Sequence, residues 1–229
     1  MSGRSVVVTG GTGALGSAVV EAFLAAGDRV VVPWIVKEEV ERARRAWAQA
    51  LEAGRARLVE ADVAEAEGAA RAVEAAGDVA VLVNGVGGFA GGSSLDETPL
   101  ETWDLMYRMN VRTAAACARA ALPRMRARGA GVIVNVASAA ALAPPAGLTA
   151  YAASKAAVVA LTRALQEEAA GDGIRVAAIV PTTIDTPANR AAMPDADFSR
   201  WTPPAKIAAV ILWLASDAAS PLRGALLPV

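Results

Sequence analysis

The sequence predicts an α/β protein built on a doubly wound parallel sheet of about seven strands, with helices on both faces in a three-layer sandwich. Short, β-branched apolar runs alternate with longer segments of helical periodicity along the whole chain. The apolar runs show no regular polar alternation, which is typical of strands buried on both faces. With 229 residues and no linker, tandem repeat or low-complexity segment, we expect one domain spanning residues 1–229.

The expected elements follow from these patterns in chain order. The expected strands are Ser5–Val8, Arg29–Val32, Arg57–Glu60, Asp78–Val83, Val132–Val136, Ile174–Val180 and Gly224–Val229. Helical patterns lie at about residues 17–26, 37–53, 64–76, 98–128, 149–170 and 203–216. We expect Pro123 to kink or interrupt the long helical region, because proline lacks a backbone N–H. Residues 182–202 read as a polar loop.

Composition narrows the kind of chemistry that is available. Hydrophobic residues make up 55% of the chain but aromatic residues only 4%, so the core is built mainly from Ala, Val and Leu. A formal charge of −1 argues against a nucleic-acid surface or a polybasic membrane surface. The absence of His removes the commonest neutral base and metal ligand, and Cys117 is the only cysteine. We therefore expect no metal site, and any acid/base catalyst must be Tyr, Lys, Asp or Glu.

One uncharged stretch, residues 129–154, is long enough to raise the question of a membrane span. Asn135, Pro144, Pro145 and several glycines and hydroxyls interrupt it, so we do not expect a spanning helix. The apolar run near the N-terminus is too short for a secretory signal. The expectation is a soluble, cytoplasmic protein.

A glycine-rich turn joins the first strand to the first helix, with the sequence Thr-Gly-Gly-Thr-Gly-Ala-Leu-Gly at residues 9–16. Strand, glycine turn and helix in this order are the context that a dinucleotide-binding loop requires. Glycines let the backbone approach a pyrophosphate, and the helix start offers free N–H groups and the positive end of its dipole. A merely tight turn between strand and helix is the alternative interpretation.

The stretch from Gly131 to Lys155 carries the candidate catalytic groups. Ser138 comes just after a buried strand, and Tyr151 and Lys155 are four residues apart, which on a helix places them on one face. A surface Tyr, a solvated Lys and a loop Ser are the alternative. The carboxyl ends of parallel strands meet at one sheet edge, so the glycine turn and Ser138 are expected to lie together, which favours an acid/base site.

Taken together, these residues resemble the classical short-chain dehydrogenase/reductase family over essentially the whole chain, with similarity to its 3-oxoacyl-[acyl-carrier-protein] reductase-like members. The resemblance implies a Rossmann-type fold, an NAD(P)(H) cofactor and hydride transfer between nicotinamide and a small-molecule carbonyl or secondary alcohol. It implies that Tyr151 is the general acid/base, that Lys155 lowers the pKa of the Tyr151 phenol and binds the nicotinamide ribose, and that Ser138 binds the substrate oxygen. Asn110 would position a water beside Lys155; a helix-surface Asn is the alternative.

The same resemblance implies a set of cofactor contacts. These are Gly10, Thr12, Gly13, Ala14, Leu15, Gly16, Trp34, Asp62, Val63, Asn84, Gly85, Val86, Tyr151, Lys155, Pro181, Ile184 and Thr186. Asp62 would meet the adenine, although it could also be the N-cap of the following helix. The lid at 182–202 would cover the substrate, with Met193, Phe198 and Trp201 as an apolar lining or as anchors of the loop.

The sequence departs from the family pattern at several points. Ala14 replaces the middle glycine, so the turn also fits the T-G-x-x-G-x-x-G spacing of the extended branch, whose larger substrate domain 229 residues do not accommodate. Asn84-Gly85-Val86-Gly87 and Pro181-Thr182 also differ from the usual Asn-Asn-Ala-Gly and Pro-Gly. These departures loosen the cofactor contacts but remove no catalytic group.

The choice between NAD and NADP stays open at the sequence level. NAD-preferring members carry an acidic residue after the second strand, and NADP-preferring members often carry an Arg. Here the corresponding residues are Trp34 and Ile35. Lys37 could reach a 2′-phosphate or could simply be a solvated charge at a helix start.

Partner and function alternatives complete the sequence-based expectations. The helices at 100–128 and 151–170 are Ala- and Leu-rich, and the family resemblance implies that they pair across subunits in a homo-oligomer, a tetramer or a dimer. Basic residues gather near the end of the first of these helices, where they either complement the helix dipole or dock an acidic carrier protein; they are Arg119, Arg124, Arg126 and Arg128. A catalytically silent nucleotide sensor or scaffold of the same fold is the main alternative function, and an epimerase or dehydratase would need a further substrate domain.

Overall fold

The computed structural model describes residues 3–229, and within them the strands form one parallel sheet in the order β3-β2-β1-β4-β5-β6-β7. The predicted fold class is confirmed. The order reverses direction between β1 and β4, which makes the gap between their carboxyl ends the place where such sheets bind ligands. The strands are β1 (Ser5–Thr9), β2 (Arg29–Trp34), β3 (Ala56–Glu60), β4 (Val79–Asn84), β5 (Gly131–Val136), β6 (Ile174–Val180) and β7 (Leu226–Pro228).

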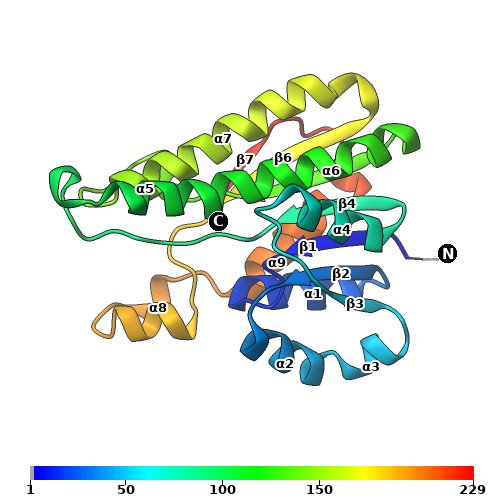
Figure 1. Cartoon of the computed structure of the whole chain (residues 1–229), viewed down its shortest axis with the longest axis horizontal. Helices are drawn as coiled ribbons and strands as arrows, with labels where there is room; N and C mark the ends of the chain where they lie inside the picture. Colours follow the sequence, from blue (N-terminus) through cyan, green and yellow to red (C-terminus); the bar gives the residue numbers. More distant parts are fainter. Residues whose placement is uncertain (1–2) are drawn as a thin grey trace.

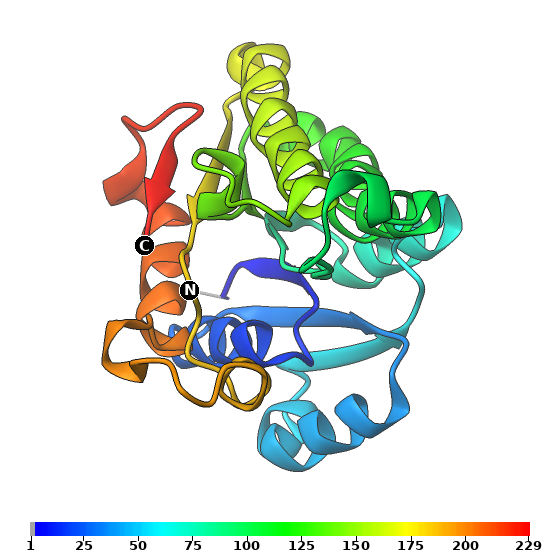
Figure 2. The same cartoon turned by 90° about the vertical axis from the view of Figure 1, so that its left-hand side faces the viewer.

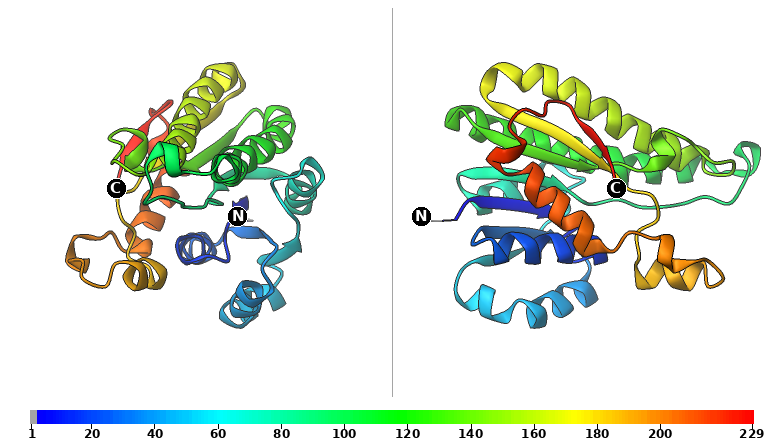
Figure 3. Two further views of the ribbon diagram at one scale, coloured as in Figure 1. Left: turned by 60° about the vertical axis from the view of Figure 1, so that its left-hand side comes forward. Right: turned by 180° about the vertical axis from the view of Figure 1, so that it is seen from behind.

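Helices cover both faces of the sheet, as Figures 1 and 2 show. They are α1 (Ala14–Ala25), α2 (Lys37–Ala46), α3 (Ala48–Glu52), α4 (Ala66–Ala76), α5 (Leu100–Tyr107), α6 (Thr113–Arg128), α7 (Thr149–Ala169), α8 (Pro187–Ala192) and α9 (Pro204–Leu214). In β1, Val6 and Val8 pack with α1 and α9, whereas Val7 packs with α4, α6 and α7. Each strand therefore serves two cores, which explains its continuous apolar character. Figure 3 shows α9 lying beside α1 on the first face.

The long helical region is interrupted, but not where the sequence suggested. Pro123 lies inside α6, which runs unbroken from Thr113 to Arg128, so the expected interruption there is wrong. Pro123 is exposed, and water can satisfy the carbonyl that its missing N–H leaves without a partner. The break is instead a π-helical turn at Arg108–Arg112, which separates α5 from α6. Single π turns inside helices are frequent at functional sites, and this one contains Asn110.

Three further elements differ from the sequence-based expectation. β2 continues through Pro33 to Trp34, which is possible because β1 is paired with β2 only as far as Val31 and therefore loses no bond to the proline. The helix expected at 37–53 is divided at Trp47, whose side chain is buried in the core between α2 and α3. The loop at 182–202 contains the short helix α8.

No helix within residues 3–229 combines the length and the apolar character that crossing a lipid bilayer requires.

Candidate active site

The carboxyl ends of β1 and β4 are joined directly by Thr9. Its hydroxyl oxygen accepts hydrogen bonds from the backbone N–H groups of Gly85 (3.1 Å) and Val86 (3.3 Å). Gly10 adopts φ +67°, and a Cβ on it would lie 2.8 Å from the Gly85 carbonyl carbon. Only glycine suits this backbone and this contact. The glycine turn and the 84–88 segment are therefore packed backbone to backbone at the switch point of the sheet.

The glycine turn fits a dinucleotide pyrophosphate. α1 begins at Ala14, its N-cap Gly13 offers no side-chain cap, and the chain folds back through a bond from the Gly13 N–H to the Gly10 carbonyl. The first N–H groups of any helix lack intrahelical partners, and no capping side chain occupies them here. Residues 10–16 thus present backbone donors and a positive dipole end at the edge where β1 and β4 diverge.

Ser138 and Tyr151 meet at the same edge. Ser138 follows β5 and caps the short turn Ala139–Ala141, with its hydroxyl accepting from the Ala140 N–H at 3.2 Å. Burial raises the pKa of the Tyr151 phenol, and a hydrogen bond from Ser138 opposes that shift. The ring of Phe89 packs edge-on against the Tyr151 ring at a centroid distance of 5.0 Å. The two hydroxyls are therefore neighbours in a partly dry environment.

Lys155 lies one helical turn from Tyr151 and is buried. Its ammonium donates to the Val136 carbonyl at 2.9 Å and stands 6.0 Å from the centre of the Tyr151 ring. Burial lowers the pKa of Lys155 to about 8. The expectation that Lys155 depresses the Tyr151 pKa is not met, because the Tyr151 pKa is raised and its causes are burial and Ser138. Lys155 is directed to the end of β5 and beside the tyrosine ring.

Asn110 is buried in the π turn, so the helix-surface alternative is wrong. Its side-chain oxygen accepts from the Gly88 N–H at 2.9 Å, and its amide donates to the Gly88 carbonyl (3.1 Å) and the Ser154 hydroxyl (2.9 Å). A Cβ on Gly87 would meet both the Asn110 oxygen (2.8 Å) and the Lys155 nitrogen (3.2 Å). Asn110 therefore fixes the loop after β4 next to Lys155; its role in positioning a water stays a prediction.

Asp62 is committed to two protein partners. Its carboxylate accepts from the Ala64 N–H at 2.9 Å and from Arg108 at 2.8 Å, while the N-cap of α4 is Glu65. The N-cap alternative for Asp62 is therefore wrong, although the side chain does close the turn before α4. Val63 packs into the core beneath it.

The side chain of Asn84 is turned into the sheet rather than toward the surface. Its amide donates to the Asn135 oxygen at 2.8 Å, and the Asn135 amide donates to the Thr162 hydroxyl at 2.9 Å. This buried chain connects β4, β5 and α7. The predicted contact with the cofactor ribose would therefore be made by the backbone of Asn84, Gly85 and Val86.

The predicted lid is folded upon itself. Thr186 caps α8 by accepting from the Asn189 N–H at 3.1 Å, and Ile184 forms a backbone bridge with Thr202. Arg190 pairs with Asp185 at 2.6 Å and stacks over Phe198 at 4.7 Å. Phe198 in turn packs on Trp201 with ring centres 4.7 Å apart, so these two aromatics pack against each other within the lid. Pro181, Ile184 and Thr186 lead from β6 into it.

Three site neighbours escaped the sequence-based reasoning. Phe89 shields Tyr151, Ser154 links Asn110 to the backbone of Tyr151, and Glu39 of α2 accepts a hydrogen bond from Thr12 of the glycine turn at 2.6 Å. Glu39 lies on a helix whose charge pattern indicates only a solvated face. The position of Ser154 directly before Lys155 was the one local signal that a polar residue is buried there.

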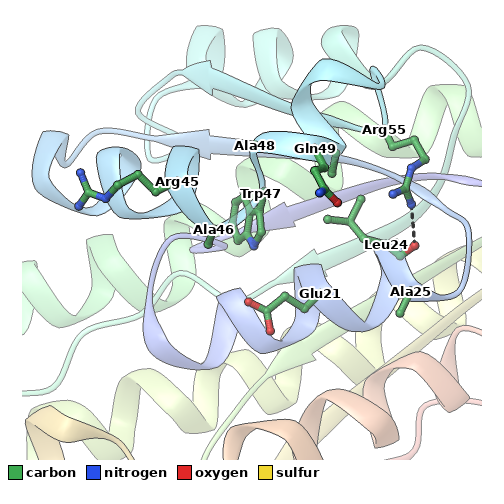
Figure 4. A pocket seen from close by; sticks show the side chains of 10 residues that line it. Glu21, Leu24, Ala25, Arg45, Ala46, Trp47, Ala48, Gln49 and Arg55 are labelled. Carbon is green, nitrogen blue, oxygen red and sulfur yellow. Dashed lines mark hydrogen bonds between the residues drawn. The ribbon is translucent and has the colours of Figure 1, made fainter.

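Two cavities lie outside this cluster of hydroxyls. A shallow one of about 490 Å³ lies between α1 and the α2–α3 region, where Figure 4 shows Glu21 and Trp47 facing each other. It is lined by no predicted site residue, and the buried Trp47 indole N–H has no partner within residues 3–229. A smaller one of about 130 Å³ lies between the loop after β4 and the start of α7, beside Ala150, which precedes Tyr151. Only the second adjoins the catalytic edge.

Three of the four basic residues expected near the end of α6 have intramolecular partners. Arg126 pairs with Asp172 at 2.7 Å, Arg128 pairs with Asp78 at 2.6 Å, and Arg124 donates to the Gly77 carbonyl at 3.3 Å. These partners precede β6 and β4, so they lie at the amino edge of the sheet, opposite Tyr151. The cluster ties α6 to neighbouring turns and gives no support to a carrier-docking surface.

No group of His, Cys, Asp and Glu side chains within residues 3–229 is arranged to hold a metal ion.

Comparison with known proteins agrees with this geometry. The family model described as short chain dehydrogenase matches residues 4–197. The chain is 41% identical to 2-(R)-hydroxypropyl-CoM dehydrogenase of Xanthobacter autotrophicus, over 80% of this chain and 76% of that protein. It is 37% identical to galactitol 2-dehydrogenase (L-tagatose-forming) of Cereibacter sphaeroides, over 100% of this chain and 94% of that one.

Solved structures give the same result. L-sorbose reductase from Gluconobacter frateurii, complexed with NADPH and L-sorbose, superimposes with a TM-score of 0.90 at 28% identity, covering 100% of this chain and 95% of that one. A blue fluorescent protein from a metagenomic library, in complex with NADPH, gives 0.88 at 33% identity, covering 100% and 96%. The chain belongs to the short-chain dehydrogenase family and is an NAD(P)-dependent oxidoreductase that acts on alcohol and carbonyl groups.

Proposed function

We propose that Tyr151 is the general acid/base of this oxidoreductase, with Ser138 as the group that binds the reacting oxygen. The observation that carries the proposal is that Ser138 lies near enough to the buried Tyr151 phenol to lower its pKa, beside the glycine turn at the edge where β1, β4 and β5 end. A substrate oxygen placed between two hydroxyls receives both orientation and a proton donor. A silent sensor would need neither group, so the alternative has no supporting feature.

The raised pKa of Tyr151 indicates which protonation state its phenol has at neutral pH. At neutral pH the phenol is protonated, so it can donate its proton to a carbonyl oxygen as the carbon is reduced. In the reverse direction an alcohol must lose its proton to the phenolate, which becomes more populated as the pH rises. The bound nicotinamide supplies or accepts the hydride. Asn110 fixes the loop that borders the site, and Lys155, directed to the end of β5, stands beside that loop.

The cofactor would be held by the turn at residues 10–16, by the backbone at 84–86 and by the neighbouring strand ends. Support comes from the uncapped start of α1 and from the contact between Gly10 and Gly85. Trp34, at the end of β2, and Asp62 would border the adenosine, while Lys155 and the lid would border the nicotinamide. The whole chain, 1–229, would act as one domain with the lid at 182–202 over the substrate.

The substrate is proposed to be a small compound with a secondary alcohol or the corresponding ketone. Relatives named for hydroxypropyl-CoM, butanediol and galactitol support this class. A 3-oxoacyl thioester loses most of its local support, because Arg126 and Arg128 are paired within the chain.

The test is the Tyr151→Phe variant, assayed with NADH and NADPH over a panel of ketones and thioesters. We expect turnover to fall about 10²–10⁴-fold, because the ring stays but the proton donor is lost. Binding of the dinucleotide, measured by calorimetry, should change little. Tyr107→Phe is the matched control, since Tyr107 is the other tyrosine and is exposed on α5. Full turnover of Tyr151→Phe on the best substrate would refute the assignment.

We further propose that the protein is a cytoplasmic homotetramer. Large apolar side chains are exposed on α5, namely Leu100, Leu105 and Tyr107, and Trp213 is exposed on α9 at another surface. A closed tetramer needs two kinds of interface and a dimer only one, and apolar side chains exposed on two separate helices are compatible with the tetramer. The single, buried Cys117 is compatible with a reducing compartment.

A further inference from the structure

The first turn of α2 is brought against the glycine turn. Thr12 donates its hydroxyl hydrogen to the Glu39 carboxylate at 2.6 Å, and Thr12 is buried while Glu39 is half-buried. This contact joins residues 27 positions apart through side chains alone. A charge-assisted bond of this length is strong enough to hold the carboxylate in one place.

Packing explains why Glu39 can reach this place. α2 starts three residues after β2 ends, and its buried residues Val40 and Ala43 fix the helix on the core. On the other side, Gly11 lies so close to β2 that a Cβ on it would stand 2.7 Å from Val32. The glycine turn, the end of β2 and the first turn of α2 therefore form one corner of the carboxyl edge.

That corner is where a dinucleotide-binding sheet receives the adenosine ribose, and an acidic residue there accepts hydrogen bonds from the ribose hydroxyls of NAD. The last residue of β2 and the residue after it cannot do this, since Trp34 and Ile35 have no carboxylate. Glu39 has one, and Thr12 bonds only its Oε2 atom, so Oε1 remains able to accept from a 2′-hydroxyl. A 2′-phosphate at the same place would meet like charge.

The other charged groups around the corner do not reverse this preference. Asp62 is paired with Arg108, and Glu38 adds a second negative charge to the first turn of α2. Lys37 is exposed and makes no ion pair within residues 3–229. Its ammonium is solvated, whereas the Glu39 carboxylate is held in position.

We propose that Glu39, held by Thr12, is the residue that makes this enzyme prefer NAD(H) over NADP(H). The inference rests on the dinucleotide site of the proposed function but not on the identity of the catalytic groups. NADPH in the neighbouring solved structures belongs to those proteins.

Binding measurements on the full chain test the proposal without any turnover. Dissociation constants are measured for NADH and NADPH by nicotinamide fluorescence, and for ADP and 2′,5′-ADP by calorimetry. The wild type should bind NADH and ADP more tightly than their 2′-phosphorylated counterparts. The ratio that matters is the dissociation constant of the 2′-phosphorylated nucleotide divided by that of its unphosphorylated counterpart. In Glu39→Gln we expect this ratio to fall by about tenfold or more, because a charged acceptor for the ribose hydroxyls is lost and the repulsion of a 2′-phosphate is relieved.

The control is Glu38→Gln, which removes the same charge from the same helical turn at an exposed position that makes no bond to the glycine turn. Its ratio should stay within about twofold of the wild type. Thr12→Val should lower the ratio while Thr12→Ser keeps it, since Ser retains the hydroxyl. Unfolding curves of each variant establish that it is folded.

Two results would overturn the inference: tighter binding of NADPH by the wild type, or an unchanged ratio in folded Glu39→Gln. Either can occur while Tyr151→Phe still abolishes turnover, so failure here is distinct from failure of the proposed function. Conversely, absence of binding for all four nucleotides would count against the dinucleotide site and the inference together. Lys37→Ala separates the remaining case, because a 2′-phosphate ligand at Lys37 would make that variant lose NADPH affinity selectively.

Discussion

At the scale of single residues, the site contains two buried titratable groups whose pKa values are shifted in opposite directions. The Tyr151 pKa is raised and the Lys155 pKa is lowered to about 8, and burial is the main cause in both cases because it disfavours whichever form is charged. Without ligand, both groups are thus displaced toward their neutral forms. Perturbed groups of this kind cluster at functional sites, where stability is given up for chemistry.

Lys155→Met is therefore expected to stabilise the ligand-free protein. Below pH 8 Lys155 is charged in both the folded and the unfolded chain, and the folded chain bears the full cost of burial. That cost is on the order of 3 kcal/mol. Between pH 8 and about 10.5 the folded lysine is neutral while the unfolded one keeps its proton, so the wild type gains stability and the difference shrinks.

Urea unfolding at pH 7 and pH 10 measures this difference. Lys206→Met, at an exposed position on α9, is the control and should change stability by less than about 0.5 kcal/mol at both pH values. A destabilised Lys155→Met protein, or a gain that does not depend on pH, would contradict the prediction.

At the scale of elements, the region between Leu100 and Arg128 shows how local and tertiary effects divide. The proline that the sequence marks as a breaker is accommodated, because it lies on the solvent side of α6. The π turn that does interrupt the region has no breaker residue. It coincides with Asn110, whose three hydrogen bonds to Gly88 and Ser154 hold the widened turn against the loop after β4 and against α7. Tertiary bonds therefore decide where this helix is irregular.

Pro123→Ala is expected to stabilise the protein by about 1–2 kcal/mol. A proline inside a helix costs about 3 kcal/mol relative to alanine, and the loss of its restriction on the unfolded chain offsets part of the gain. Chemical denaturation monitored by circular dichroism measures the change. Pro145→Ala, in the loop before α7, makes the same substitution outside a helix and should be slightly destabilising. Equal effects of the two substitutions would show that α6 bears no strain at Pro123.

At the scale of the whole molecule, the apolar side chains exposed on α5 and α9 govern the expected assembly. Leu105→Arg should disrupt the interface at α5 and Trp213→Arg the one at α9, since a buried unpaired charge is costly at any interface. Each single variant is expected to run as a dimer and the double variant as a monomer. Size-exclusion chromatography with light scattering measures the masses. Met193→Arg, exposed on the lid, should remain a tetramer; a monomeric wild type would contradict the proposal.

The sequence determined the parts of this protein that depend on local order. Continuous apolar strands alternating with helices fix a parallel sheet, parallel strands bring their carboxyl ends to one edge, and helical spacing places Tyr151 and Lys155 on one face. The predicted positions of Ser138 at the end of β5 and of the glycine turn before α1 follow from the same rules, and the structure shows both.

The tertiary structure alone decided what depends on distant segments packing together. Asp62 forms an ion pair with Arg108, Asn110 is hydrogen-bonded to Gly88 and Ser154, and Glu39 accepts a hydrogen bond from Thr12. No sequence periodicity predicts contacts across these separations. Side-chain environments follow from the same packing, so the direction of the Tyr151 pKa shift emerged only once its burial was known. Short-range sequence patterns therefore predict the reaction class. The protonation states of the site residues, and Glu39 as the candidate determinant of cofactor choice, depend on contacts that form only in the folded chain.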